Sequence, residues 1–593
     1  MTLFGLPISV SLPNLSYFSI YNACNINGLG CYSSLVDLYA TEYSGLIYLP
    51  VGIADYGIAL INDKVYQYSY NTDEVVGFVY LKYFDTKPEP GPLCASEYEN
   101  AGTVQLNGVV AINSNYGRTY YLWAQNVLDF NNEDLSYEFV NNIWDANKYD
   151  NVLENYPVYG RGIIKTYFSF PHTTKFYVYS TDSYDLIYPI AVYLIMKVYI
   201  NNNSYPVIQF GYSLDGNNTI WYDNVTVEVP SVSAYFQVSP SYTPDYTVKN
   251  LELVIGGPGN SECIYADKID GYLALLYNNN GNLSTAPYVF NYGLNTAEES
   301  TNINPLLVSS TEAYLSTGYF YPGYLGSKNI SYYTVTIYNP ITKEYETETS
   351  PIILYKVYNF TPIITVPGGY YKLMGIYVNN ILHPSSSIPL LIDKNYTINL
   401  NYKLYYFVDL TIPGGKYFVN NKQYIGENTI TVENGTTLTI YLNKYYYYNN
   451  LRYECPGQVN ITVSGPENIQ LLNYCIPEYY VQINSKLPIN ITIGSITITN
   501  ITSYSDYIPV NQTIYIHKSV IIKDRFFYYN IYTIDPENIT VNQPIQISLY
   551  PTKTIKLNYI TITGTVSGIL VSIPTSIIFI KKRRKKKKKL NKQ

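Results

Sequence analysis

Charged residues are scarce in this chain, and so are the residue types on which most hydrolytic sites depend. Asp, Glu, Lys and Arg together make up 14% of the 593 residues, and there are three histidines. These histidines, His172, His383 and His517, lie too far apart in sequence to suggest a metal site, and no His-Glu-x-x-His motif occurs. The sequence therefore predicts no metal ion and implies no cofactor.

The motifs of several other kinds of hydrolytic site are missing as well. Without Gly-x-Ser-x-Gly and with few histidines, the sequence argues against a serine triad. Neither Asp-Thr-Gly nor Asp-Ser-Gly occurs, so a paired-aspartate site lacks its motif. The six cysteines form an even set that we expect to be oxidised, which argues against a thiol nucleophile. Any hydrolytic site would then use carboxyl chemistry in acid, where a Glu or Asp near its own pKa acts as general acid or base.

Long stretches with apolar residues at helical spacing are absent before residue 557. The 74 tyrosines, together with Ile, Val and Thr, favour strands, and the chain is too long for one core. We predict an all-β protein with one C-terminal transmembrane helix. Its predicted parts are a two-sheet β-sandwich domain at 1–326, small β-sandwich modules at 327–405, 406–477 and 478–556, a membrane helix at 557–580 and a basic tail at 581–593.

Short sequences that recur within the chain support the prediction of tandem modules. The sequence TVPGGYY at Thr365 returns as TIPGGKYF at Thr411, and PENI at Pro466 returns at Pro536. We expect a Pro-Gly turn between strands in each module. The preferred interpretation is a spacer that lifts the first domain away from a membrane.

The C-terminal end carries a strong charge asymmetry. Residues 557–580, from Leu557 to Ile580, contain no charge, and nine Lys or Arg residues follow at 581–589. A helix of that length spans about 36 Å, against a hydrocarbon core of roughly 30 Å. The basic run predicts a short cytoplasmic tail and a single-pass cell-membrane protein whose bulk is extracellular. A buried apolar segment with a nuclear-type basic tail is the alternative.

Of the other features, the sequons support an extracellular location, whereas the lack of a signal peptide conflicts with it. Ten of the 37 Lys and Arg residues lie after residue 580 and none of the 44 Asp and Glu residues does, so the remaining body is acidic, which argues against a nucleic-acid partner. Residues 1–15 show no signal peptide; we expect a misplaced or truncated start rather than another export route. Fourteen Asn-x-Ser/Thr sequons predict glycosylation at Asn14, Asn202, Asn217, Asn224, Asn282, Asn329, Asn359, Asn395, Asn434, Asn460, Asn490, Asn500, Asn511 and Asn538.

Three disulfides are expected from the six cysteines. Cys24 with Cys31 and Cys455 with Cys475 are the local pairs, which leaves Cys94 with Cys263. Six cysteines allow about 15 pairings, so other pairings stay open.

Residues 120–130, YYLWAQNVLDF, are predicted to form a strand, and this strand is the starting point for assigning a functional site. Alternation separates an apolar face, which includes Tyr120, Leu122, Ala124, Asn126, Leu128 and Phe130, from a second face. The second face carries Tyr121, Trp123, Gln125, Val127 and Asp129. An aromatic-walled face with an amide at its middle suggests a groove for an extended peptide. The alternative is a sandwich strand with a wet outer face.

Several short motifs in a fixed order give the chain a family resemblance. GIADYG, QLNGVV, LWAQNV with NNIWD after it, QFGY, YDNVTV, ELVIGGPGN and NTAE occur in that order. Together they resemble thermopsin, a family of secreted acid proteases from hyperthermophilic, acid-loving archaea, over roughly residues 45–326. The chain departs from the expected pattern at Ala124, where an apolar residue of another kind is expected. The resemblance implies an acid endopeptidase acting on proteins or peptides.

The site residues are assigned by a weaker analogy. The all-β pattern and the order of a Gln strand and a later Glu strand also resemble the fungal glutamic peptidases. By position, Gln125 would be the amide that stabilises the oxyanion and Glu252 the general base. Tyr121 and Trp123 would line the substrate groove. The alternative carboxyls are Asp55, Asp223 and Glu298, with an Asp55–Glu252 or Asp55–Asp223 pair sharing a proton as the second choice.

We therefore predict a membrane-anchored, glycosylated, metal-independent acid endopeptidase, with other surface-layer proteins as further predicted partners. The competing prediction is a non-catalytic cell-surface structural or adhesive glycoprotein built on the same sandwich, because a groove and a binding face use the same residue types.

Overall fold

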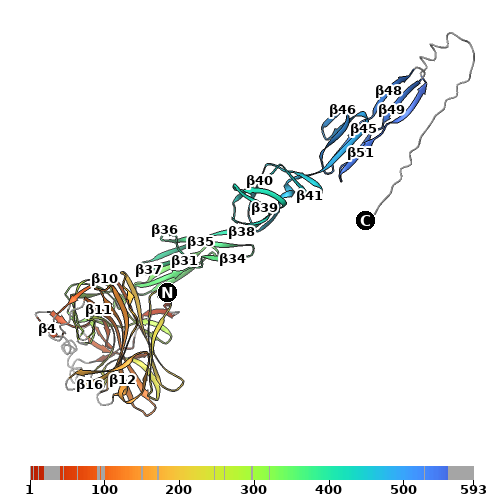
Figure 1. Cartoon of the computed structure of the whole chain (residues 1–593). Coiled ribbons are helices and arrows are strands. Elements are labelled where there is room, and N and C mark those ends of the chain that lie inside the picture. Colours follow the sequence, from red (N-terminus) through yellow and green to blue (C-terminus); the bar gives the residue numbers. More distant parts are fainter. Residues whose placement is uncertain are drawn as a thin grey trace, which may run out of the picture. The chain divides into compact units, whose positions relative to one another are not determined.

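The chain folds almost entirely into β-strands, as the computed structural model shows (Figure 1). The structure describes residues 2–3, 6–10, 13–18, 41–43, 46–62, 64–89, 94, 100–147, 151–169, 172–245, 247–259, 261–294, 298–319, 321–525 and 528–557. Within these residues the helical elements are α3 (Val152–Asn155) and the 3-10 turn η1 (Leu471–Tyr474). Contacts divide the chain into a first unit, residues 1–362 and 373–402, and a second unit, residues 363–372 and 403–593. The prediction of a β protein is confirmed.

One large sheet of the first unit contains the strand predicted at 120–130. Its main path is antiparallel throughout. In order across the sheet its strands are β15 (Ile163–Ser169), β16 (His172–Ser180), β13 (Ser136–Asp145), β12 (Thr119–Asn131), β11 (Ala101–Ser114), β23 (Leu251–Gly256), β6 (Val51–Asp55), β26 (Val289–Tyr292) and β30 (Tyr324–Gly326). Branching from this path are β9 (Tyr70–Thr72), β17 (Tyr184–Asp185), β21 (Ser231–Tyr242) and β22 (Val248–Lys249).

A second large sheet of the same unit forms the other layer. In order its strands are β1 (Thr2–Leu3), β2 (Leu6–Val10), β25 (Asn282–Thr285), β24 (Ile264–Asn279), β10 (Glu74–Pro88), β18 (Ile190–Ile200), β19 (Pro206–Ser213), β20 (Ile220–Val227) and β14 (Val158–Tyr159). Branching from it are β27 (Ser300–Thr301), β28 (Ile303–Ser309) and β29 (Glu312–Thr317).

The two sheets enclose one continuous apolar core. Leu122 and Ala124 of β12 are fully buried in the same cluster as Leu194 of β18 and Phe210 of β19. Along β13, buried and half-buried residues alternate without interruption, which is the pattern of a strand with one face on a core. The predicted sandwich and the apolar face of β12 both follow from this alternation.

The outer face of the second sheet is covered by residues beyond the predicted end of the first domain. Ile352 and Leu354 are fully buried against Phe78 of β10 and Tyr193 of β18. The smaller sheets and remaining strands of the first unit are β3 (Ser16–Phe18), β7 (Ile58–Ile61) and β8 (Lys64–Gln67); β4 (Thr41–Tyr43) and β5 (Leu46–Tyr48); β33 (Leu354–Asn359) and β37 (Ser387–Ile392); and β31 (Tyr333–Asn339), β32 (Glu344–Ser350) and β36 (Ile381–His383). The domain boundaries drawn from the sequence stay predictions.

The second unit consists of further antiparallel and mixed ladders. Strands β35 (Gly369–Val378) and β38 (Tyr396–Val419) contribute residues to both units. The others are β34 (Ile363–Val366), β39 (Lys422–Glu433), β40 (Thr437–Leu442), β41 (Tyr445–Tyr448), β42 (Leu451–Glu454), β43 (Gln458–Thr462), β44 (Glu467–Gln470), β45 (Ile476–Ile493), β46 (Ile496–Pro509), β47 (Thr513–Ile516), β48 (Ser519–Arg525), β49 (Tyr528–Ile534), β50 (Glu537–Thr540), β51 (Ile545–Leu549) and β52 (Thr552–Leu557).

The two Pro-Gly repeats have different structural roles. Gly368, with a φ of 73°, makes the expected tight turn between β34 and β35. The second repeat lies inside β38, where it shifts the register with β39 between Thr411 and Lys416. The expectation of a Pro-Gly turn is therefore wrong for the second repeat, which is a bulge. The hairpin between β38 and β39 turns instead through Asn420 and Asn421, whose positive φ angles suit a two-residue hairpin turn.

No helix among the described residues has both the length and the apolar character needed to cross a bilayer. Apart from Leu557, the predicted membrane helix and the basic tail lie outside the described residues. Both stay predictions.

Candidate active site

A row of polar side chains crosses β12, β11 and β23 on the face of the sheet that points away from the sandwich core. Asn107 of β11 lies opposite Gln125 of β12 on one side and opposite Glu252 of β23 on the other. Neighbouring strands are about 4.8 Å apart, so Gln125 and Glu252 are separated by roughly 10 Å along this row. Asn142 of β13 continues the row beyond Gln125. The structure thus brings both predicted site residues to one face.

Period-two alternation explains why these polar residues share a face. Leu251 and Leu253 flank Glu252 in sequence and lie in the sandwich core. On β12, Ala124 is likewise buried in the core, so its neighbour Gln125 points the other way. Burying the apolar set of each strand leaves the amide and the carboxyl on the opposite side.

The segment that follows β26 covers Glu252. The main-chain nitrogen of Leu294 donates a hydrogen bond to Glu252 Oε2 at 2.9 Å. A Cβ atom at Gly293 would lie 2.8 Å from the same oxygen and 2.8 Å from Val254 Cγ1, so the close approach of this segment requires glycine. Glu252 has no exposed surface as a result.

Gln105 of β11 joins the two predicted residues to a second glutamate. Its Oε1 accepts hydrogen bonds from Gln125 Nε2 at 3.2 Å and from Asn107 Nδ2 at 3.4 Å. Its Nε2 donates to Glu298 Oε2 at 2.9 Å. Asn107 Nδ2 also donates to Glu252 Oε1 at 2.8 Å. We call these five side chains, Gln105, Asn107, Gln125, Glu252 and Glu298, the amide–carboxyl network.

The Glu252 carboxyl is held by three donors. Asn107 and Asn250 each donate through Nδ2 at 2.8 Å, and the Leu294 nitrogen supplies the third bond. Burial raises the pKa of Glu252 above its ordinary value, while the three hydrogen bonds oppose that rise because they stabilise the charged form.

Glu298 lies in a different environment from Glu252. Its side chain is half-buried, and its carboxyl accepts one hydrogen bond, from Gln105. Burial raises the pKa of Glu298 to about 7, and the nearby carboxyls of Glu299 and Glu262 add to the rise, while the Gln105 bond opposes it. At acid pH this group is therefore a neutral carboxylic acid.

Aromatic side chains continue from Gln125 toward β16. Trp144 Nε1 donates to Gln125 Oε1 at 3.0 Å, which fixes the orientation of the amide. Trp144 stacks on Phe176 with ring centroids 4.1 Å apart, and Tyr167 meets the same indole edge-on at 5.8 Å. One of the two Gln125 Nε2 hydrogens is used by Gln105, which leaves the other for an incoming acceptor.

The two predicted groove residues, Tyr121 and Trp123, share this face and are half-buried. Lys249 Nζ donates to the Tyr121 hydroxyl at 3.2 Å and lies 4.6 Å from the centre of its ring. Trp123 Nε1 is buried and has no hydrogen-bond partner within the part of the chain that the structure describes. A buried donor of this kind suits a peptide carbonyl.

Asp55 lies on the other side of the sheet. It is opposite Leu251, on the core side, and Tyr68 and Tyr70 donate their hydroxyls to its two oxygens at 2.6 and 2.9 Å. The Gly57 nitrogen adds a third bond at 2.8 Å. Burial raises the pKa of Asp55 to about 6 against the effect of these donors.

Asp223 of β20 belongs to a separate buried cluster. It accepts hydrogen bonds from Tyr177 Oη at 2.7 Å, from Asn141 Nδ2 at 2.9 Å and from the Arg161 nitrogen at 3.0 Å. Asp55 therefore shares no hydrogen bond with Glu252 or with Asp223, and the expected proton-sharing pairs are not formed. The reason is the strand alternation itself, which directs Asp55 to the opposite face from Glu252.

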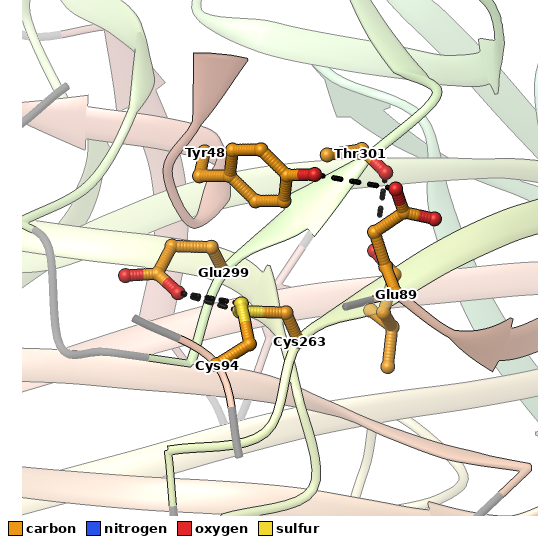
Figure 2. Close-up of a disulfide and its surroundings, with 7 residues drawn as sticks. Tyr48, Glu89, Cys94, Cys263, Glu299 and Thr301 are labelled. Atoms are coloured by element: carbon orange, nitrogen blue, oxygen red, sulfur yellow. Dashed lines mark hydrogen bonds between the residues drawn. A yellow bond between two sulfur atoms is a disulfide. The ribbon is translucent and has the colours of Figure 1, made fainter. Parts of the chain in front are cut away.

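A disulfide lies beside the segment that carries Glu298 (Figure 2). Cys94 and Cys263 are joined, and Glu299 Oε2 lies 2.7 Å from Cys263 Sγ. The structure also contains the expected Cys455–Cys475 bond, whereas Cys24 and Cys31 lie outside the described residues. Two of the three expected pairings are thus present.

The residues at this disulfide do not suit a metal ion. Cys94, Cys263 and Glu299 form the one group of potential ligands that gathers closely enough for a metal ion among the residues the structure describes. The two sulfur atoms are bonded to each other and so are not thiolates, which are the form that binds zinc. The donor set as formed does not fit a metal ion.

Comparison with known proteins finds sequence similarity over the region that contains this sheet. Residues 32–303 match the thermopsin family model, a little under half of the chain. This region of the chain is therefore similar to the thermopsin family. It is also 28% identical over 260 residues to thermopsin of Sulfolobus acidocaldarius, covering 43% of this chain and 75% of that protein. The family resemblance inferred from the sequence motifs is confirmed.

Sequence reasoning missed two members of the amide–carboxyl network, Gln105 and Asn107. Both lie in the QLNGVV motif, where they are polar residues at a spacing of two among the mostly apolar residues of β11. Polar residues at that spacing in an apolar strand mark one face, so the signal was present. Glu298 was predicted as an alternative carboxyl, and it joins the network from a distant segment of the chain through its hydrogen bond with Gln105.

Proposed function

We propose that the thermopsin-like region is an endopeptidase that hydrolyses peptide bonds in proteins at acid pH, by carboxyl chemistry and without a metal ion. The amide–carboxyl network carries this proposal, because it gathers two glutamates and three amides on one face of the sheet within the matched residues. Thermopsin of Sulfolobus acidocaldarius, the relative described above, supports the same class of activity.

The network contains the parts that amide hydrolysis needs. The remaining Gln125 N–H would stabilise the oxyanion that forms on the scissile carbonyl, a contribution of roughly 3 kcal/mol for one donor. Trp123 Nε1 would bind a carbonyl of the extended substrate, and Tyr121 would line the same face. A carboxyl of the network would move the protons of water and of the leaving nitrogen. Glu252 as the general base stays a prediction.

We expect the full-length protein in detergent to cleave a denatured protein substrate between pH 2 and 7 at high temperature, with less cleavage above pH 7. Chelators should leave the rate unchanged within about twofold. Gel or peptide-mass analysis of the products measures both effects. Cleavage that a chelator abolishes would contradict the metal-independent mechanism.

A second candidate function is a surface protein that binds without cleaving. The observation in its favour is the complete burial of Glu252 under Gly293 and Leu294. A folded protein that cleaves no substrate at any pH in the same assay would favour this candidate.

We also propose that the protein is anchored in the cell membrane, with its bulk extracellular and glycosylated, and that other surface-layer proteins are among its partners. The uncharged residues 557–580 and the basic run after them support the anchor. Thirteen of the fourteen sequon asparagines are exposed, whereas Asn217 is half-buried and donates to the Val357 carbonyl at 2.7 Å.

Expression of the full chain beside a chain ending at residue 556 tests the anchor. The full chain should remain in the membrane fraction after alkaline washing, and the shortened chain should not. Equal release of both would contradict the proposed anchor.

A further inference from the structure

The two glutamates of the amide–carboxyl network differ in their access to a substrate. Glu252 has no exposed surface, and three donors occupy its two oxygens. Glu298 is half-buried, and within the described part of the chain its carboxyl accepts one hydrogen bond, from Gln105. Of the two residues, Glu298 is the one that retains exposed surface.

Main-chain hydrogen bonds hold the carbonyls of Glu298 and Glu299. The Gly257 nitrogen donates to the Glu298 carbonyl, and the Ile264 nitrogen donates to the Glu299 carbonyl at 3.0 Å. A Cβ atom at Gly256 would lie 2.4 Å from the Glu298 carbonyl oxygen, so this approach depends on glycine. The Cys94–Cys263 disulfide beside Glu299 adds a covalent link at the same place (Figure 2). The backbone from Glu298 to Glu299 is therefore held against the end of β23 and the start of β24.

From this difference we propose that Glu298 is the catalytic carboxyl of the proposed peptidase and that Glu252 is a positioning residue. Glu252 holds the Asn107 amide, Asn107 and Gln125 both donate to Gln105 Oε1, and Gln105 Nε2 in turn holds Glu298. The inference rests on the proposed function, because a chain that cleaves nothing has no catalytic carboxyl.

The proton movements follow from the neutral form of Glu298. Among the described residues, the groups that act on its carboxyl are the Gln105 amide and the carboxyls of Glu299 and Glu262, and none of these is a cation that would oppose protonation in acid. Water adds its oxygen to the carbonyl carbon, which gives a tetrahedral intermediate. The Glu298 O–H passes a proton to the nitrogen of this intermediate as the C–N bond breaks, and the added oxygen returns a proton to the Glu298 carboxylate. The products are a carboxylic acid and an amine, and Glu298 ends as it began.

The pH dependence distinguishes the two roles. Because the pKa of Glu298 is raised to about 7, the proton that the leaving nitrogen needs is lost as the pH rises through that value. The fall in kcat at high pH therefore belongs to Glu298. A positioning residue changes the rate without removing this fall.

Two isosteric variants of the full-length protein test the proposal. E298Q keeps an oxygen for the Gln105 bond but cannot move a proton, and we expect kcat to fall at least 100-fold with KM changed less than threefold. E252Q should lower kcat about tenfold and retain the fall in activity near pH 7. E298D should recover part of the rate. E312Q, which alters a buried glutamate on β29 outside the network, is the matched control and should keep wild-type kinetics.

Circular dichroism at the assay pH shows that each variant is folded. If E298Q is folded and keeps more than a tenth of the wild-type kcat with the same high-pH fall, Glu298 is not the catalytic carboxyl and the inference is overturned. If E252Q instead loses more than 100-fold and E298Q does not, the roles are reversed. A folded wild-type protein without activity would overturn the proposed function itself.

Discussion

The protein should be more stable at pH 4 than at pH 7.5, with a loss of at least about 3 kcal/mol in the free energy of unfolding between them. Burial raises the pKa of Asp55 from 3.8 to about 6, and each unit of such a shift corresponds to about 1.4 kcal/mol. Burial likewise raises the pKa of Asp145 to about 6 and of Glu298 to about 7. The folded state therefore favours the neutral, protonated form of each of these carboxyls.

The direction of this change in the free energy of unfolding follows from proton linkage. Between about pH 4 and 7 the folded protein retains protons on these carboxyls that the unfolded chain has released. The free energy of unfolding therefore falls as the pH rises through this window, and the contribution is fully present below the unfolded pKa values. An ordinary protein with ion-paired carboxylates behaves in the opposite way in acid.

Thermal unfolding of the full-length protein across this pH range measures the effect, and we expect Tm to fall by roughly 5 to 10 °C. The D55N variant is the control. Its baseline stability will be lower, because asparagine cannot accept all three of the bonds made to Asp55, but its Tm should fall less between pH 4 and 6.5. A Tm that rises with pH over this range would refute the explanation.

Replacing Asn126 with leucine should destabilise the sandwich by about 3 to 6 kcal/mol, most of the stability of a typical domain. Asn126 is fully buried on the core face of β12. Its Nδ2 donates to the carbonyls of Ile195 and Gly211 at 2.9 Å, and its Oδ1 accepts from the Tyr222 hydroxyl at 2.8 Å. Leucine would remove all three of these hydrogen bonds from the core.

Y222F is the graded control for this variant, because it removes one of the three bonds and keeps the ring. We expect a cost of about 1 to 3 kcal/mol, well below that of N126L. Urea unfolding of both variants at the pH of greatest stability gives the comparison. Equal stability of N126L and the wild type would show that the two sheets do not depend on this amide.

The strand patterns were predictable because they depend on local alternation. Residues 120–130 form β12, and Leu122 and Ala124 lie in the core as their spacing indicated. The same rule directs Gln125 to the opposite face, where Asn107 lies between it and Glu252. The second Pro-Gly repeat shows the limit of the rule, because the same residues can make a turn or a bulge.

The sequence by itself determined the β class, the family resemblance and which side chains of a strand share a face. Alternation and motif order can be read along the chain, because they depend on residues that are close in sequence. Only the tertiary structure decided which side chains meet. Gln105 reaches Glu298 across 193 residues of chain, and the segment at Gly293 closes over Glu252. Such contacts depend on strand order across the sheet, and no local pattern encodes that order. The register between β23 and β6 likewise set Asp55 opposite Leu251 rather than Glu252, so that alternation directs its side chain to the core face.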